Sequence, residues 1–397
     1  MAEQTATRQQ SSFLVIAVLA LLSVFPPLAT DMYLSAFKDI QAAYGAADGA
    51  MELSLSIFFL GLCMGQLIFG PVIDRVGRRG PLLLGVAVFC ASTLVLLLND
   101  NIHLFIALRL VQALGACAGM VVGRAVVSDL FEGREAAKMM TLLVMLMSLG
   151  PISAPFIGSL LVTYINWQSV FVVMLVIGLV ALGLSWWAIP ETLSAEQRNK
   201  EPLSASLSQY AGILKRRKFL LPSLAGAFVQ AGLFAFITTS SSLFIGRFGL
   251  TNIQYGLCFG SVTLGLVVAS QVNARLLETL SVARIVDFVL PVYVLGGVGL
   301  LVVSSTNELL LLLVPLWLSV AMVGLISANV MALAMRASHG NLGAGSALLG
   351  ALQFGIAFLC SSVVGSFPSA GALPLALGIL IPGLVASVLW VLFRRSE

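Results

Sequence analysis

Long stretches without charge dominate this sequence and restrict what it can fold into. The chain has 397 residues, of which 59% are hydrophobic and only 10% are charged, and its mean hydropathy is +1.04. Soluble domains contain about 25% charged residues, so these values indicate an integral membrane protein. The stretches are too long for barrel strands, and lipid leaves no backbone polar group unpaired without cost. We therefore expect them to be helices.

The number of these stretches predicts the number of membrane spans. A spanning helix needs about 20 apolar residues, and runs of that length occur near residues 13–34, 51–71, 81–98, 104–124, 139–162, 169–189, 220–245, 253–273, 284–304, 309–331, 343–364 and 372–393. The sequence thus predicts an all-α membrane protein with twelve transmembrane helices. The first run is long enough to span and follows a polar N-terminus, so we do not expect a cleavable signal peptide.

One connection is longer and more polar than the others. Residues 190–219 are rich in charge and serine and include two prolines, which predicts a linker or surface helices outside the bilayer. This segment divides the chain into an N-terminal six-helix half, residues 1–189, and a C-terminal six-helix half, residues 220–397.

Basic residues set the orientation of the chain in the membrane. With the N-terminus inside, 18 of the 21 Lys and Arg fall in inner segments. Lys38 and Arg247 lie outside, and Arg109 lies within a span. The positive-inside rule therefore predicts a multi-pass protein in which both termini and the linker are cytoplasmic.

Three ionisable residues lie within or at the edge of apolar runs, namely Asp31, Glu52 and Arg109. Charge in a membrane is costly, so each is a functional candidate by default. Pro26 and Pro27 precede Asp31 and allow an irregular helix there. Burial and a nearby cation act in opposite directions on a carboxyl group, which makes Asp31 a candidate proton switch with Arg109 as its partner.

Each of these residues also has a simpler interpretation. Asp31 would then be a structural acid at a helix end, and Glu52 a solvated acid in the first turn of a helix. Arg109 would extend along the helix to the outer surface.

Three short motifs resemble those of the major facilitator superfamily. Between the second and third runs stands GPVIDRVGRR, which resembles the family's G-x-x-x-D-R-x-G-R-[RK] loop. In the fourth run, RLVQALGA begins at Arg109 and resembles R-x-x-Q-G-x-G-[AS]; it includes Gln112, and Ala113 replaces a glycine. In the fifth run, GPISAPFIGS resembles the G-P-x-x-[GA]-P-x-x-G-G motif of antiporters, with Ser159 in place of the last glycine.

The stretch around Asp31 narrows the resemblance. TDMYLSAF is similar to the D-M-Y-L-P-A signature of the bicyclomycin- and chloramphenicol-resistance branch of bacterial drug exporters, with Ser35 in place of the proline. WQSVF and PETL, which flank the sixth run, also resemble that branch. No confident motif stands in the C-terminal half.

The resemblance implies a fold of two pseudo-symmetric six-helix halves that rock around a midplane site. It also implies a gating loop of Gly70, Asp74, Arg75, Gly77 and Arg78, with Asp129 as a partner of Arg78, and an antiporter motif of Gly150, Pro151, Pro155 and Gly158. The implied activity is proton-coupled antiport that exports small lipophilic drugs from the cytoplasm across the bacterial inner membrane. Export of a physiological metabolite, such as a nucleoside or an amino acid, is the alternative.

A drug pocket would be mainly apolar with a few polar groups. The candidate lining residues are Asp31, Tyr33, Phe58, Arg109, Gln112, Gln230, Phe234, Gln353 and Phe354. Each could instead face lipid or a neighbouring helix.

Other classes of function lack their sequence signatures. The chain has no G-x-x-x-x-G-K-[ST] for ATP and no H-E-x-x-H or C-x-x-C for a metal, and no sequence typical of a channel filter. We therefore expect neither an enzyme nor a channel, and no cofactor, metal or nucleic-acid partner. The expected partners are a small-molecule substrate, protons and the lipid bilayer, and the expected state is a monomer.

Overall fold

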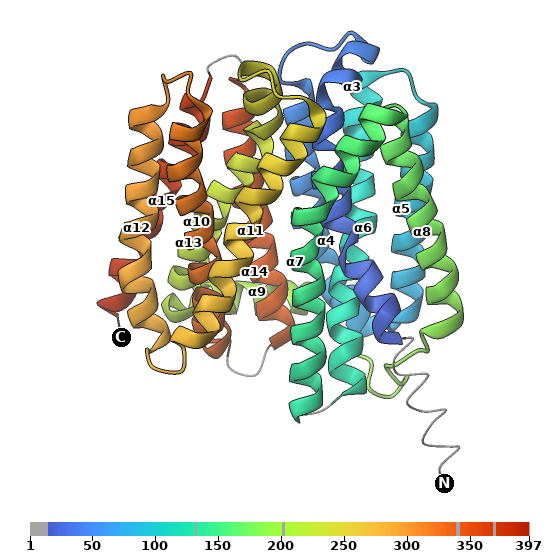
Figure 1. Cartoon of the computed structure of the whole chain (residues 1–397). Coiled ribbons are helices and arrows are strands. Elements are labelled where there is room, and N and C mark those ends of the chain that lie inside the picture. The colour runs from blue at the N-terminus through green and yellow to red at the C-terminus, as the bar shows by residue number, and fades with distance from the viewer. Residues whose placement is uncertain (1–14, 132, 201–202, 339–341, 368–370, 397) are drawn as a thin grey trace, which may run out of the picture.

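Long helices running through the full height of one bundle make up the protein (Figure 1). The structure, a computed structural model, describes residues 15–131, 133–200, 203–338, 342–367 and 371–396. Within that part of the chain, eleven helical segments are long and apolar enough to cross a membrane: Val15–Tyr44, α4 (Ala50–Val76), α5 (Arg79–Leu98), α6 (Ile102–Leu130), α8 (Gln168–Ala188), α10 with its continuation η3 (Arg217–Arg247), α11 (Asn252–Leu276), α12 (Val282–Val303), α13 (Leu309–Arg336), α14 (Leu342–Gly365) and α15 (Leu373–Arg394).

A further helix, α7 (Gly133–Tyr164), covers the remaining predicted span, 139–162. It is 32 residues long and runs beside the others through the bundle (Figure 1). Every one of the twelve predicted spans thus coincides with a helix, and the prediction of an all-α membrane protein is confirmed. Some observed helices, such as α4 and α6, extend several residues beyond the predicted runs, whereas α8 and α15 match them to within one residue.

The segment between α8 and α10 holds one shorter helix, α9 (Leu203–Leu214). The residues from Ile189 to Lys200 that precede it are not helical. The Tyr210 hydroxyl on α9 donates a hydrogen bond to the carbonyl oxygen of Leu67 on α4 at 3.3 Å. We call the end of the bundle that carries Ile189–Arg216 the linker end, and the end that carries the turn at Gly45–Gly49 the far end.

The first membrane span is not a regular α-helix. After α2 (Phe25–Pro27) it passes into a π-helix, η1 (Leu28–Met32), then a 3-10 turn, η2 (Leu34–Ala36), and ends as α3 (Phe37–Tyr44). The two prolines lack N–H donors, and the Thr30 hydroxyl lies 2.9 Å from the carbonyl oxygen of Pro26, so the regular ladder of hydrogen bonds is interrupted here. Asp31 lies on the π-helix.

Two groups of helices pack mainly within themselves. In the first group α6 packs against α4 and α5, and α8 packs against α5; in the second, α10 packs against α13, α14 and α15, and α12 packs against α13 and α15. Two helix pairs join the groups, α4 with α14 and α7 with α11. These two pairs hold the N-terminal helices against the C-terminal ones. A relative movement of the two groups would therefore occur along these pairs.

Small residues bring these helices close together. A Cβ added at Gly61 would lie 2.6 Å from the Cβ of Ala113, and one at Gly65 would lie 2.6 Å from the Cβ of Cys117, so α4 and α6 approach along a glycine face. Between α4 and α14, the Cys63 thiol lies 3.2 Å from the carbonyl oxygen of Ala351. Close approach through small residues is typical of helices packed in lipid.

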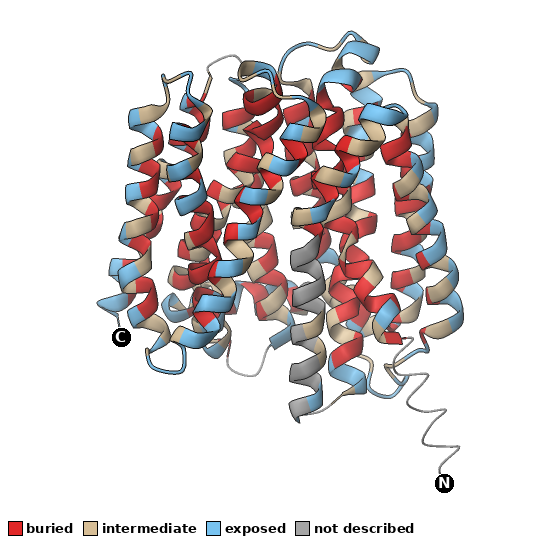
Figure 2. Ribbon diagram, in the orientation of Figure 1, coloured by how far each residue is buried: buried red, intermediate tan, exposed pale blue. Residues whose placement is uncertain are grey.

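Burial follows the membrane pattern. Buried residues line the centre of the bundle, and exposed ones cover its outside (Figure 2). Large apolar side chains on the outside include Leu84, Phe288 and Leu310, which are 66%, 69% and 75% exposed. Such side chains are stable on an outer surface that faces lipid.

Candidate functional site

Asp31 is buried in the first span, with 2% of its surface exposed. The Thr30 hydroxyl lies 2.8 Å from its Oδ1 oxygen, within hydrogen-bond distance. The π-helix packs against α7 and α8, and the turn that follows it, η2, also meets α11. On α11, Tyr255 is fully buried as well. The Tyr255 hydroxyl in turn lies 3.0 Å from Ser240 Oγ on α10.

Arg109 on α6 is also fully buried. Its Nη2 donates to the carbonyl oxygen of Ala29 at 2.7 Å, and its Nη1 donates to Gln112 Oε1. The guanidinium carbon lies 4.4 Å from the centre of the Tyr33 ring and 4.5 Å from that of Phe58. Two aromatic faces and a backbone carbonyl therefore stabilise this charge in place of a carboxylate.

The expected direct pairing of Asp31 with Arg109 is not formed. Within the described part of the chain the ion pairs are Arg78–Asp74, Arg78–Asp129 and Arg394–Asp287. Arg109 binds the backbone two residues before Asp31, and side chains two positions apart point to different faces of a helix. The arginine thus holds the turn that carries Asp31 rather than the carboxylate itself.

A chain of side-chain hydrogen bonds extends from Arg109 into α5. Gln112 Nε2 donates to Thr93 Oγ1 at 2.8 Å, and the Thr93 hydroxyl donates to the carbonyl oxygen of Phe89 at 2.6 Å. All three side chains, Arg109, Gln112 and Thr93, are completely buried. These bonds fix the orientation of the guanidinium, whose buried Nε has no hydrogen-bond partner within the described part of the chain.

The glycine-proline motif on α7 packs directly against the irregular part of the first span. A Cβ at Gly150 would lie 2.6 Å from that of Pro27, and a Cβ at Gly158 would clash with the carbonyl oxygen of Met32. On its other side, α7 accepts a hydrogen bond at the Pro151 carbonyl from Thr263 Oγ1 of α11, at 3.2 Å. The motif, which also includes Pro155, therefore lies between the π-helix and the C-terminal helices.

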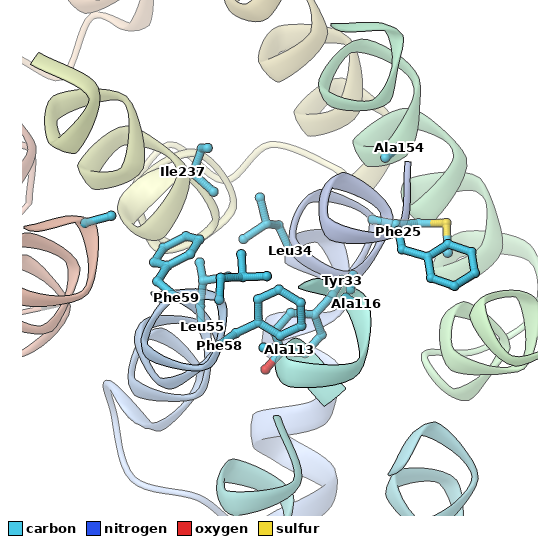
Figure 3. Packing of buried hydrophobic residues seen from close by; sticks show 14 of the residues in the cluster. Phe25, Tyr33, Leu34, Leu55, Phe58, Phe59, Ala113, Ala116, Ala154 and Ile237 are labelled. Carbon is cyan, nitrogen blue, oxygen red and sulfur yellow. The ribbon is translucent and has the colours of Figure 1, made fainter. Parts of the chain in front are cut away.

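The candidate pocket residues do not gather around a single space. Tyr33 and Phe58 cover Arg109, while Gln230 accepts a hydrogen bond from Ser327 of its own helix group at 2.9 Å. Gln353 is half-buried on α14. Figure 3 shows Phe58 and Phe59 leaving α4 in different directions, the first beside Tyr33 and the second toward Ile237 of α10.

An aromatic cluster joins the two helix groups near the middle of the bundle. The Phe59 ring lies 4.6 Å from that of Phe234, and the Phe234 ring lies 5.8 Å from that of Phe354. Phe234 and Phe354 were predicted to line the pocket, but Phe59 was not. Phe59 follows Phe58 directly, and because neighbouring residues on a helix face different sides, that position could have indicated that Phe59 faces another helix.

The GPVIDRVGRR loop forms a charged turn at the linker end. Arg78 Nη1 donates to Asp74 Oδ1 at 2.6 Å and its Nε donates to Asp129 Oδ2 at 3.0 Å, so the expected contact between Arg78 and Asp129 is present. Gly77 has φ of 108°, a conformation that favours glycine. Asp129 also accepts a hydrogen bond from Thr192 at 2.7 Å.

Glu191, in the PETL segment, completes this turn and was missed from the sequence. Its carboxylate accepts hydrogen bonds from the backbone N–H groups of Arg78, Arg79 and Leu193, at 2.8, 3.3 and 3.0 Å. Partial burial acts to raise the pKa of Glu191, but these three donors outweigh it and hold the pKa below its usual range. The segment after α8 is thereby fixed to the gating loop.

Contacts at the linker end also cross between the helix groups. Arg124 on α6 donates to Gln66 Oε1 of α4 at 3.2 Å and to Ser346 Oγ of α14 at 3.3 Å. Arg75 donates to Ser206 Oγ of α9 at 3.0 Å. These residues line a cavity of about 560 Å³, together with Gly70, Asp74 and Arg78.

The geometry described above defines the class of this protein: a multi-span helical membrane protein with two helix groups, a buried ionisable centre and a charged loop between spans two and three. The chain belongs to the major facilitator superfamily, whose family model matches residues 19–361. Within it, the chain belongs to the branch of bicyclomycin-resistance proteins. It is 32% identical to the bicyclomycin resistance protein homolog of Haemophilus influenzae, over 93% of both chains.

Two further comparisons agree with this assignment. The multidrug transporter MdfA of Yersinia pestis is 28% identical over 82% of this chain and 80% of its own. The crystal structure of a D-xylose-proton symporter superposes with a TM-score of 0.73 at 13% identity, covering 94% of this chain and 97% of that one. This structural likeness supports the fold.

Proposed function

We propose that this chain is a proton-coupled antiporter that exports small lipophilic drugs or antibiotics from the cytoplasm by alternating access, and that it is a transporter rather than an enzyme. One observation carries the proposal. Asp31 is a carboxylate that is almost completely buried within the first span, on a π-helix that packs against α7. Intramembrane carboxylates of this kind are typical of proton-coupled carriers. The names of the relatives, which refer to bicyclomycin resistance and multidrug transport, support drugs as the cargo.

The proposed coupling acts through the charge of Asp31. When the carboxylate is ionised, the cost of keeping it in the interior favours the conformation in which water or a bound substrate reaches it. Binding a proton removes that cost and favours the opposite conformation, so substrate and proton exchange in turn. Arg109 and Gln112 contribute by holding the Ala29 turn, which fixes where Asp31 lies.

The proposed substrate region lies between Asp31 and the aromatic cluster of Phe59, Phe234 and Phe354. Aromatic walls with few polar groups bind lipophilic molecules without requiring one hydrogen-bond pattern. Four further residues lie beside this region in the proposal and become accessible to the substrate when the two helix groups separate: Tyr33, Phe58, Gln230 and Gln353. This arrangement suits a carrier of several drugs.

The proposed cycle moves two halves, residues 1–189 and 220–397, around that region. The linker, 190–219, and both termini are cytoplasmic in this proposal, and the protein is a monomer in the bacterial inner membrane, surrounded by lipid. The loop residues Asp74, Arg78 and Asp129 act as part of the gate at the linker end. A cofactor is not required.

Substitution of Asp31 by Asn in proteoliposomes tests the proposal. Asn keeps the shape of the side chain and can still accept a hydrogen bond from Thr30, so the fold should be retained while the titrating group is lost. We expect chloramphenicol or bicyclomycin added to wild-type proteoliposomes to drive proton movement, measured with an internal pH-sensitive dye, and Asp31→Asn to reduce that movement to the level of empty liposomes.

Asp100→Asn, at an exposed acid of the far end, is the matched control and should behave as wild type. Proton movement unchanged by Asp31→Asn would refute the role of Asp31. If nucleosides or amino acids drive proton movement and the drugs do not, the alternative substrate class is correct.

A further inference from the structure

Glu52 is a second carboxylate buried between the helix groups. It lies in the first turn of α4, has 3% of its surface exposed, and accepts a hydrogen bond from Ser242 Oγ of η3. Among the described residues no ion pair includes Glu52. The interpretation of Glu52 as a solvated acid at a helix start is therefore wrong.

The surroundings of Glu52 come from three elements. A Cβ added at Gly365 of α14 would lie 2.7 Å from the Cβ of Glu52, so only a glycine leaves room there. The Thr238 side chain of α10 adjoins the same glycine and is fully buried, and its hydroxyl oxygen has no hydrogen-bond partner within the described part of the chain. Glu52 thus lies at the junction of α4, α10 with η3, and α14.

This junction borders a cavity at the far end. Glu52 lines a space of about 1070 Å³, whose walls come from the first span and α4 on one side and from Ser241, Ser242 and Arg247 on the other. A polar cavity of this size holds water. Protons at the far end therefore have a route to Glu52 through this cavity, and Asp31 is not among the described residues that line it.

Four ionisable groups face Glu52 or share its cavity. Lys38 and Asp48 line the cavity from the N-terminal side, and Arg247 lines it from η3, where it donates to the carbonyl oxygens of Ser304 and Thr306, both at 2.9 Å. The fourth group is the Tyr33 hydroxyl, which lies within hydrogen-bond distance of Met51 and Ser54, the residues on either side of the Glu52–Leu53 pair in α4.

A run of five consecutive hydroxyl residues, Thr238–Ser242, leads inward from Glu52. Ser242 donates to Glu52, and Ser240, two residues earlier, lies 3.0 Å from the hydroxyl of Tyr255. Thr239 and Ser240 also donate to the backbone carbonyls of Ala235 and Ile237 in their own helix. The run therefore makes the part of α10 beside Glu52 polar.

We propose that Glu52 is a second proton-binding residue of the transport cycle, which takes up protons from the far-end cavity. This inference rests on the proposed function. A hydronium ion in the cavity gives one proton to the Glu52 carboxylate and becomes water. When the carboxyl group ionises again, a water molecule accepts that proton and becomes hydronium.

The test is Glu52→Gln, compared with wild type in oriented proteoliposomes. The Gln side-chain oxygen can still accept the hydrogen bond from Ser242, so the junction is retained and only titration is lost. We expect the rate of drug-driven proton movement to fall at least about tenfold, in line with the contribution of positioned proton-transfer groups, and its pH profile to change. The Kd of chloramphenicol and the Tm should stay near the wild-type values.

One control variant accompanies Glu52→Gln. Asp100→Asn, an exposed acid of the same end outside the cavity, should have no effect.

The outcomes distinguish this inference from the proposed function. If Glu52→Gln leaves the rate and the pH profile unchanged, the inference is overturned. If drugs still drive proton movement in wild type in the same experiment, the proposed function is upheld. A loss of Tm and of drug binding that matches the loss of transport would mean that Glu52 is only structural, and would also overturn it. Absence of proton movement in wild type would instead reject the proposed function.

Discussion

Arg109 illustrates how a single buried charge is stabilised without an acid. Its guanidinium binds the carbonyl of Ala29 and the side chain of Gln112 while lying against the rings of Tyr33 and Phe58. The planar group presents several donors in fixed directions and two faces for aromatic contact. A lysine at this position has one compact charge and cannot satisfy these contacts together.

We therefore predict that Arg109→Lys keeps the positive charge but loses the function. The Ala29 turn would no longer be held, so Asp31 would be displaced and drug-driven proton movement should fall to background. Loss of buried hydrogen bonds to a charged group should also destabilise the fold by about 2 kcal/mol. The measurements are the proteoliposome assay and the Tm in detergent.

Arg275→Lys, at an exposed residue near the end of α11, is the control for this substitution and should change neither value. Full activity in Arg109→Lys would mean that charge alone matters at this position.

At the scale of elements, the first span combines a helix break with a close neighbour. The π-helix that carries Asp31 is held on one side by Arg109 and on the other by the glycines of α7, which leave no space for a side chain next to Met32 and Pro27. An irregular helix is stable only where surrounding contacts determine its conformation. The antiporter motif therefore acts here as a packing surface for the π-helix.

Gly158→Ala tests this role. Its methyl group would overlap the carbonyl oxygen of Met32, and overpacking of this kind costs about 1–3 kcal/mol. We expect a lower Tm and weaker proton coupling, because the turn with Asp31 must shift.

The matched variant is Gly183→Ala on α8, where an added Cβ meets nothing within 4 Å. It should be neutral or slightly stabilising, because alanine favours a helix. Equal effects of the two substitutions would show that the close contact at Gly158 is unimportant.

At the scale of the whole molecule, the described contacts hold the two helix groups together at the linker end. Arg124 of α6 bonds to Ser346 of α14 between the two groups, and Arg75 of α4 bonds to Ser206 of α9 in the linker segment. Beside this interface, the Cys63 thiol contacts the carbonyl of Ala351. Breaking one polar contact should shift the population toward conformations open at this end, since each is worth about 1 kcal/mol.

Labelling of Cys63 by a maleimide measures that shift. In a protein whose other four cysteines are replaced by alanine, Ser346→Ala should speed labelling about fivefold, the factor that corresponds to roughly 1 kcal/mol. Ser327→Ala, which removes a hydrogen bond inside the C-terminal group only, should leave the rate unchanged. Slower labelling in Ser346→Ala would contradict the interpretation of this contact as a latch.

Much of this architecture could be predicted because it depends on local composition. The apolar runs define the helices, since lipid requires every backbone group to be paired within its own segment. Pro26 and Pro27 predict a break near Asp31. The contact of Arg78 with Asp129 was implied by the resemblance of the loop to the family motif. The Gly150–Gly158 motif predicts close packing, although not its partner.

The partners of buried polar groups could not be predicted, because they depend on residues distant in sequence. Arg109 does not bond to Asp31 but to the carbonyl oxygen of Ala29, while the Thr30 hydroxyl lies beside the Asp31 carboxylate. Glu52 begins a helix, where a solvated acid is common, yet Ser242 and Gly365 from the C-terminal helices enclose it. Glu191 has no motif of its own and acquires its role only where α8 ends beside Arg78.

The sequence by itself determined the membrane environment, the helices, the family and the small set of ionisable residues within the spans, because each follows from hydropathy or from residues adjacent in the chain. Only the tertiary structure decided which of those residues meet. It separates Asp31 from Arg109, joins Phe59 to Phe234, and connects Glu52 through Ser242 to the hydroxyl run, because the packing of α4 and α7 against α14 and α11 determines what each buried group contacts.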